Sequence, residues 1–159
     1  MTTKIRRSLD ERDQGFTLIE LLVVIIIVGI LAAIAIPVFL NQREKGVDAG
    51  MRSDVRNLSN ALEAYTVDNP LSDTFEPAGT TLAQNIAESG FKKSPGNTVQ
   101  LVGSPRDGYC VRASNAGSSG GATTYVWYDS KNGGLMAGAP TATRPASFAT
   151  CNGTFVTVP

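Results

Sequence analysis

The side chains that usually carry catalysis are absent or unaccompanied in this chain. It contains no histidine, the residue that most often serves as acid–base catalyst or metal ligand near neutral pH. Serine and threonine are plentiful, but neither a histidine nor a Gly-x-Ser-x-Gly elbow accompanies them to activate a nucleophile. No glycine-rich phosphate loop with a lysine occurs. The sequence therefore predicts a protein that is not an enzyme and that needs no cofactor.

The sequence also has few residues that could bind a metal or carry out redox catalysis. From Lys92 onward the only acids are Asp107 and Asp129, too few for a carboxylate-rich calcium site, so no metal is expected. Cys110 and Cys151 have 40 residues between them, a spacing that fits no zinc knuckle or CxxC redox motif. In an exported chain such a pair would close a disulfide, worth about 4 kcal/mol in the chain-entropy model. Two buried thiols in a cytosolic protein are the alternative.

One acid, Glu20, stands where a charged N-terminal segment meets a long apolar run. The run from Leu21 to Leu40 has no charge, and as a helix it would span about 30 Å, the hydrocarbon thickness of a bilayer. Four basic residues precede the run and favour an N-terminus inside the cell: Lys4, Arg6, Arg7 and Arg12. Arg43 and other bases follow the run closely and weaken this preference. The disulfide argument places the C-terminal part outside.

An acid at the start of a spanning segment is costly unless it is paired, so Glu20 is a functional candidate. A simpler interpretation is that Glu20 only caps its own helix. Thr17 to Glu20 form a Thr-x-x-Glu capping box, with Phe16 and Leu21 placed as its hydrophobic staple. Glu20 could cap its helix at one stage and pair with a cation at another.

Residues 15 to 20 read Gly-Phe-Thr-Leu-Ile-Glu, between a charged leader and an apolar run. This arrangement closely resembles the precursors of type IV pilins and the related pseudopilins. The resemblance implies that a prepilin peptidase cuts between Gly15 and Phe16 and methylates the new amino group of Phe16. It also implies that Glu20 pairs with that ammonium on a neighbouring subunit. Physics favours the pair, because a buried carboxylate and a buried ammonium each need an opposite charge in a dry filament core.

The resemblance extends through Pro37 and more weakly along the following helix to Asn69. Gly29 and Pro37 bracket a segment that melts locally in assembled filaments of the family; the alternative is that membrane helices simply tolerate these residues. The implied partners are further copies in a helical filament, the membrane, the prepilin peptidase, and the pilus assembly platform with its ATPase. The 15-residue leader is longer than in many relatives that begin with Phe.

The apolar run is followed by an amphipathic stripe, which predicts one helix from Thr17 to Val67, about 75 Å long. The stripe consists of Val47, Met51, Val55, Leu58, Leu62 and Tyr65. Asp68, Asn69 and Pro70 supply the breaker. Four parts are expected: a cleaved leader (1–15), a transmembrane and filament-core helix (16–40), its amphipathic continuation (41–68) and a β-rich head (69–159).

Beyond Pro70 the composition predicts a small antiparallel sheet covered by the stripe, hence an α+β fold with one disulfide. The expected strands are Thr98–Val102, Tyr109–Ala113, Thr123–Tyr128 and Phe155–Val158. Tyr125 and Trp127 should share one face, with Val126 and Tyr128 on the other. Gly117–Gly121 and Asn132–Gly134 are expected to be loops, and a short helix is expected near Leu82–Glu88.

The sequence predicts a structural subunit, the major pilin of a type IV pilus, that starts as a single-pass protein of the cytoplasmic membrane and ends in a filament on the bacterial surface, with a role such as adhesion. A pseudopilin of a type II secretion or DNA-uptake system is the first alternative. A soluble domain released by signal peptidase near Ala35, at an A-x-A site, is the second. Direct nucleic-acid binding is not expected, because the six bases and six acids from residue 66 onward balance and do not cluster.

Overall fold

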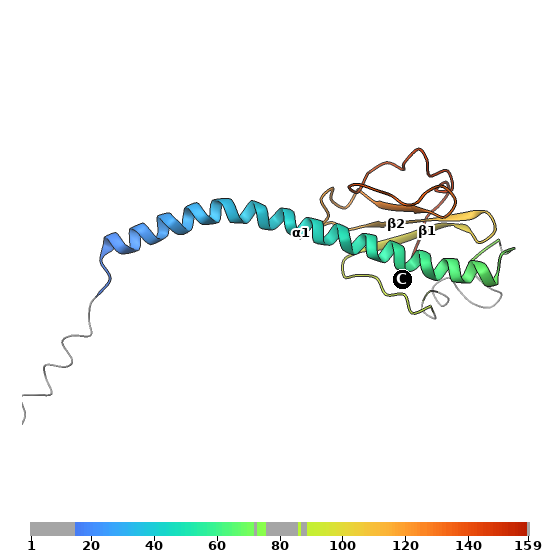
Figure 1. Cartoon of the computed structure of the whole chain (residues 1–159), viewed down its shortest axis with the longest axis horizontal. Helices are drawn as coiled ribbons and strands as arrows, with labels where there is room; N and C mark the ends of the chain where they lie inside the picture. The colour runs from blue at the N-terminus through green and yellow to red at the C-terminus, as the bar shows by residue number, and fades with distance from the viewer. Residues whose placement is uncertain (1–14, 72, 76–85, 87–88, 159) are drawn as a thin grey trace, which may run out of the picture. The chain divides into compact units, whose positions relative to one another are not determined.

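The computed structural model describes residues 15–71, 73–75, 86 and 89–158. One long helix, α1 (Leu18–Asp68), precedes an antiparallel sheet in the order β4-β3-β2-β1-β5 (Figure 1). The strands are β1 (Thr98–Ser104), β2 (Gly108–Ser114), β3 (Val126–Asp129), β4 (Gly134–Leu135) and β5 (Val156–Thr157). The α+β fold expected from the sequence is confirmed.

Helix α1 begins and ends within one residue of the predicted bounds. Its end follows from local chemistry: the backbone N–H and the side-chain amide of Asn69 both donate to the carbonyl of Tyr65, at 3.0 and 3.1 Å. Pro70 then prevents another helical turn. The chain divides between Leu40 and Asn41 into two units, so each part of α1 is described with its own unit.

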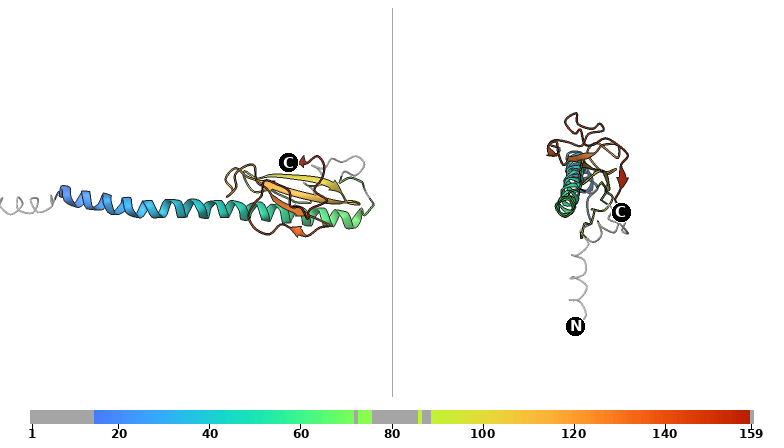
Figure 2. Two further views of the ribbon diagram at one scale, coloured as in Figure 1. Left: turned by 90° about the horizontal axis from the view of Figure 1, so that it is seen from above. Right: turned by 90° about the vertical axis from the view of Figure 1, so that its right-hand side faces the viewer.

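In the second unit, the amphipathic part of α1 covers one face of the sheet (Figure 2). Met51, Val55 and Leu58 are fully buried, and Leu62 is nearly so. They form one cluster with the inward side chains of the sheet, which include Val99, Leu101, Val111, Ala113 and Val126. Each large apolar side chain removed from water contributes about 1.5–3 kcal/mol, so the predicted stripe is the main support of this core.

Polar contacts fix the helix against the segments that surround the sheet. The buried Asp54 carboxylate accepts hydrogen bonds from the backbone N–H and hydroxyl of Ser94, both 2.8 Å, and from the amide of Asn97, 2.7 Å. The Tyr109 hydroxyl shares its one proton between two acceptors, Oε1 of Glu63 at 2.7 Å and the Ser59 carbonyl at 3.0 Å. Burial, reinforced by Glu63, raises the pKa of Tyr109 far above its usual range, so this hydroxyl stays protonated.

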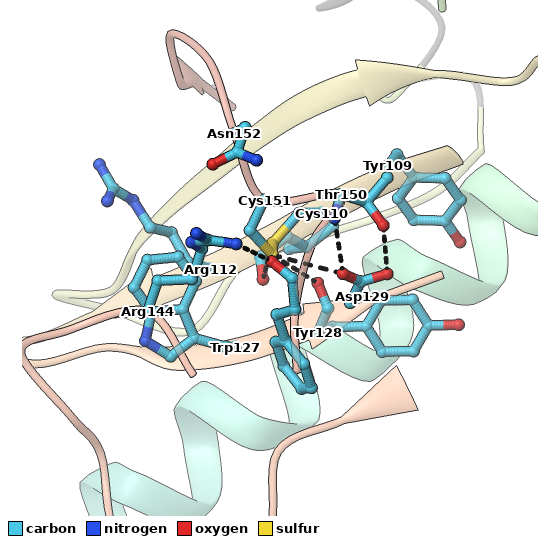
Figure 3. The surroundings of a disulfide bond; sticks show 12 residues. Tyr109, Cys110, Arg112, Trp127, Tyr128, Asp129, Arg144, Thr150, Cys151 and Asn152 are labelled. Atoms are coloured by element: carbon cyan, nitrogen blue, oxygen red, sulfur yellow. Dashed lines mark hydrogen bonds between the residues drawn. A yellow bond between two sulfur atoms is a disulfide. The ribbon is translucent and has the colours of Figure 1, made fainter. Parts of the chain in front are cut away.

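The opposite face of the sheet carries a second, smaller core, built around the disulfide between Cys110 and Cys151 (Figure 3). Its buried side chains also include Trp127, Met136 and Phe148. The predicted disulfide is confirmed, and the predicted division of β3 between its two faces holds. This second core was not predicted, because Met136, Phe148 and Cys151 join the strand residues Cys110 and Trp127 from segments with no strand or helix period.

Several local expectations were wrong. Strand β3 begins at Val126 rather than Thr123, because the preceding segment closes a turn in which the Thr124 N–H donates to the Gly121 carbonyl. Gly134 lies in β4 rather than in a loop, since tertiary pairing with Asp129 places it there. The last strand is shorter than Phe155–Val158. The short helix expected near Leu82–Glu88 lies, apart from Ile86, outside the described residues.

Candidate processing and assembly site

The capping box predicted at the start of α1 is present. The Thr17 hydroxyl accepts a hydrogen bond from the Glu20 N–H at 3.2 Å, and Glu20 Oε2 accepts from the Thr17 N–H at 3.0 Å. The Thr17 hydroxyl also donates to Oε2, at 2.9 Å. Thr17 is therefore the N-cap, and Gly15 and Phe16 lie immediately before the helix.

Capping uses only one oxygen of the Glu20 carboxylate. All three contacts involve either Oε2 or the Glu20 backbone, and within the described part of the chain no donor reaches Oε1. A carboxylate has about four lone-pair positions, so one oxygen can cap while the other accepts a second bond. The local interpretation and the pairing interpretation of Glu20 are thus compatible in one conformation.

The surroundings of Glu20 are apolar and open. Its side chain lines a groove of about 360 Å³ with Phe16, Ile19, Val23 and Val24. Phe16 is 88% exposed, and among the described residues nothing covers the groove. A carboxylate beside apolar walls would be desolvated once another surface closes over it, and it would then require a cation.

The whole first part of α1 is similarly uncovered. From Phe16 to Leu40 the large apolar side chains are 47–88% exposed, and the mean hydropathy reaches 3.3 over an 18-residue window. By length and composition this helix could cross a membrane. Exposed apolar surface on this scale needs lipid or protein against it.

Gly29 and Pro37 both lie within α1 and do not interrupt it. A Cβ added at Gly29 would meet nothing within 4 Å. Packing against the described residues therefore does not require this glycine. The remaining predicted residues, Cys110 and Cys151, form the disulfide of the head and take no part in this site.

Sequence reasoning missed one buried charge in the head. Asp129 is fully buried, and its carboxylate accepts hydrogen bonds from the N–H groups of Lys131, Asn132 and Thr150 and from the Thr150 hydroxyl. Figure 3 shows this carboxylate facing Thr150 beside the disulfide. Its position in a buried strand followed by Ser-Lys-Asn-Gly was the available signal, since Asp commonly accepts backbone bonds in such turns.

These donors set the ionisation of Asp129. Burial by itself would raise its pKa, but the bonds from Thr150, Lys131 and Asn132 outweigh burial and hold the pKa below the usual value. Among the described residues, the charge is stabilised by neutral donors. The carboxylate fastens the segment around Thr150 and Cys151 to the end of β3.

Comparison with known proteins agrees with the geometry of the N-terminal site. Residues 11–36 match the prokaryotic N-terminal methylation motif. The chain is 33% identical over 116 residues to the type IV wide pilus major component PilA4 of Thermus thermophilus, covering 72% of this chain and 79% of that protein.

Relatives of a second kind are equally similar. The chain is 41% identical over 106 residues to type II secretion system core protein G of Escherichia coli, covering 58% of this chain and 73% of that protein. It is 34% identical over 90 residues to the Klebsiella pneumoniae protein of the same name, covering 51% of this chain and 64% of that relative. With its capped helix start, uncovered apolar helix and disulfide-bonded sheet, the chain belongs to the family of type IV pilins and pseudopilins, whose members are processed by prepilin peptidase and assemble into filaments.

Proposed function

We propose that this chain is the major subunit of a type IV pilus. The leader is removed after Gly15, the amino group of Phe16 is methylated, and the apolar part of α1 holds the subunit in the membrane until assembly. The observation that carries this proposal is the uncovered apolar surface from Phe16 to Leu40, with an available carboxylate oxygen at its start.

Assembly follows from the chemistry of that start. Cleavage creates an ammonium on Phe16, four positions before Glu20. Oε1 of Glu20 is available to the ammonium of an adjacent copy, while Oε2 continues to cap the helix. The pair neutralises both charges as the groove beside Phe16 is closed by neighbouring helices. Repetition of one heterologous contact gives a helical filament in which α1 forms the core.

A pseudopilin of a type II secretion system is the second candidate, favoured by the relatives named core protein G. The acid content of the head supports the pilin instead. Asp107 and Asp129 are the only acids after residue 92, and the oxygens of Asp129 are already occupied by protein donors. The resemblance to secretion pseudopilins would imply a carboxylate-rich calcium site, to which these two acids offer little.

Local opening of α1 between Gly29 and Pro37 belongs to the same proposal. Proline removes one helical hydrogen bond, and Gly29 packs against nothing in the described part of the chain. Opening there would let the helix lengthen as subunits pack.

The test combines analysis of the mature N-terminus with the effect of deleting the gene for this chain. Mass spectrometry of the protein isolated from its native membrane should find an N-terminal peptide beginning at methylated Phe16; a start at Ile36 would overturn the proposal. Electron microscopy of sheared surface filaments should find this chain as their main component. Surface filaments lost on deletion, with secretion intact, support the pilin. Secretion lost without any change in surface filaments would assign the chain to a secretion system.

A further inference from the structure

A row of polar side chains crosses the sheet on the face opposite α1. The register pairs Thr157 of β5 with Gln100 of β1, Gln100 with Arg112 of β2, and Arg112 with Trp127 of β3. Their strand neighbours Leu101, Val111 and Val126 are in the core beneath α1, so alternation puts the row on the other face. We call these four residues the Arg112 row.

The Arg112 guanidinium is held in place by aromatic rings. Its central carbon lies 3.9 Å from the ring centre of Phe155, 4.3 Å from that of Tyr125 and 5.5 Å from that of Trp127. Its Nε donates to Gln100 Oε1 at 2.8 Å, and Gln100 Nε2 donates to the Thr157 hydroxyl at 3.3 Å. Stacking and one in-plane bond together fix both the position and the rotation of the guanidinium.

The two terminal nitrogens remain available. Among the described residues, no acceptor lies within hydrogen-bond distance of Nη1 or Nη2, and no acid lies within ion-pair distance. The Gln100 oxygen, which could have offered an acceptor at the surface, is used by Nε. The row therefore presents a positive charge and several N–H donors, with the Thr157 hydroxyl at its end.

Nearby acidic side chains do not neutralise the positive charge of Arg112. Asp129 lies on the same face of β3 but is fully buried, and its oxygens accept bonds from Lys131, Asn132 and Thr150. Arg144 donates to the Phe148 carbonyl and adds a second cation to this side of the head (Figure 3).

We propose that the Arg112 row is an oxyanion-binding site, in which the Nη1 and Nη2 groups of Arg112 bind a carboxylate or phosphate group. A guanidinium fork matches both oxyanions with two parallel N–H···O bonds. Because the fork is already immobilised by the rings and by Gln100, binding does not require it to be ordered again. The ligand is the anionic group of a molecule that reaches the surface of the head.

The chain contains a single tryptophan, Trp127, and it belongs to the row, so in the folded protein its fluorescence is sensitive to binding at this site. The experiment titrates full-length protein in neutral detergent micelles with sodium acetate or sodium phosphate, using sodium chloride at matched ionic strength as reference. We expect a saturable change in Trp127 emission with acetate, phosphate or both, and no saturable change with chloride. The more effective salt identifies the preferred oxyanion.

Two variants of Arg112 distinguish the effect of the guanidinium geometry from the effect of its charge. Arg112→Lys keeps the charge but loses the bidentate geometry, and it should raise the half-saturating concentration roughly tenfold or more. Arg112→Gln should abolish saturation, and it replaces the lysine variant if that protein does not fold. The control Arg106→Lys alters a cation that already pairs with Asp73 and should titrate like the parent. No saturable change in the parent, or an unchanged titration in both Arg112 variants, would overturn the proposal.

Discussion

At the scale of single residues, two carboxylates illustrate how the number of donors decides the role of an acid. Glu20 has one oxygen engaged by its own helix start and one without a donor in the described chain. Asp129 has both oxygens engaged and no exposure. These contacts support the proposed role of Glu20 between copies and place Asp129 in the stability of the head.

The assignment of Glu20 is tested by replacing its charge while preserving its cap. Glu20→Gln keeps a carbonyl that can accept from Thr17 but cannot pair with an ammonium. Leaving a buried ammonium unpaired costs about 3 kcal/mol, so filament yield should fall well over tenfold, with membrane insertion and cleavage after Gly15 unchanged. Counting filaments by electron microscopy and immunoblotting the processed protein measure both.

Thr17→Ala is the matched control. It removes the cap at a cost of about 1 kcal/mol in helix stability but retains the Glu20 charge, and filaments should persist. Normal filaments in Glu20→Gln, or equal losses in both variants, would show that Glu20 acts through capping.

The lowered pKa of Asp129 predicts how the stability of the head depends on pH. Its folded-state pKa is below that of an unfolded aspartate, about 3.9, so its stabilisation is fully present above that pH and is lost as pH falls through the folded value. Asp129→Ala should lower the free energy of unfolding by about 3 kcal/mol at neutral pH, because it leaves several donors unpaired. Urea unfolding followed by Trp127 fluorescence should also show a weaker acid dependence in the variant. An identical acid profile would contradict this role.

At the scale of elements, the two parts of α1 are built for different partners. The part before Asn41 exposes its apolar side chains on every side, whereas the part after it buries only a stripe against the sheet. A helix that is apolar all round requires an apolar environment, and an amphipathic one requires a single apolar face. The stability of the head and the stability of the filament should consequently respond to different residues.

A pair of truncations tests this separation. Leu58→Ala empties a fully buried site beneath the sheet and should lower the free energy of unfolding of the head by about 3 kcal/mol. Val28→Ala alters a side chain that is 57% exposed and should leave that free energy unchanged. Both are measured by urea unfolding of the full chain in neutral detergent. A comparable loss in the two variants would show that the apolar part contributes to head stability.

At the scale of the whole molecule, the described head depends on one covalent link between β2 and the C-terminal segment. Cys110 and Cys151 are both buried, and Asp129 fastens the same segment through Thr150. The apolar part of α1 belongs to the other unit and has no share in this link.

Replacing both cysteines with alanine should lower the free energy of unfolding of the head by about 4 kcal/mol. Insertion into the membrane and cleavage after Gly15 should continue, because the proposed determinants of both precede Asn41. Urea unfolding measures the first effect, and membrane fractionation with N-terminal mass spectrometry measures the second. Loss of cleavage in the double variant would show that processing depends on a folded head.

The sequence by itself determined the features that arise from neighbouring residues. The capping box, the helix over nearly its full predicted range and the buried stripe follow from spacing within a turn or two of helix. The N-terminal motif resembled the correct family for the same reason: its residues are contiguous. Four of the five strands were recognised from β-prone runs, although with imprecise ends.

Only the tertiary structure decided the features that join distant segments. The two-residue strand β4 exists because β3 lies beside it, and in the second core loop residues that carry no periodic signal pack against Cys110 and Trp127 of the strands. The donors around Asp129 come from two separate segments, and the rings around Arg112 are likewise brought together only by folding. Pairings of this kind depend on register and loop closure, which local residue patterns do not specify.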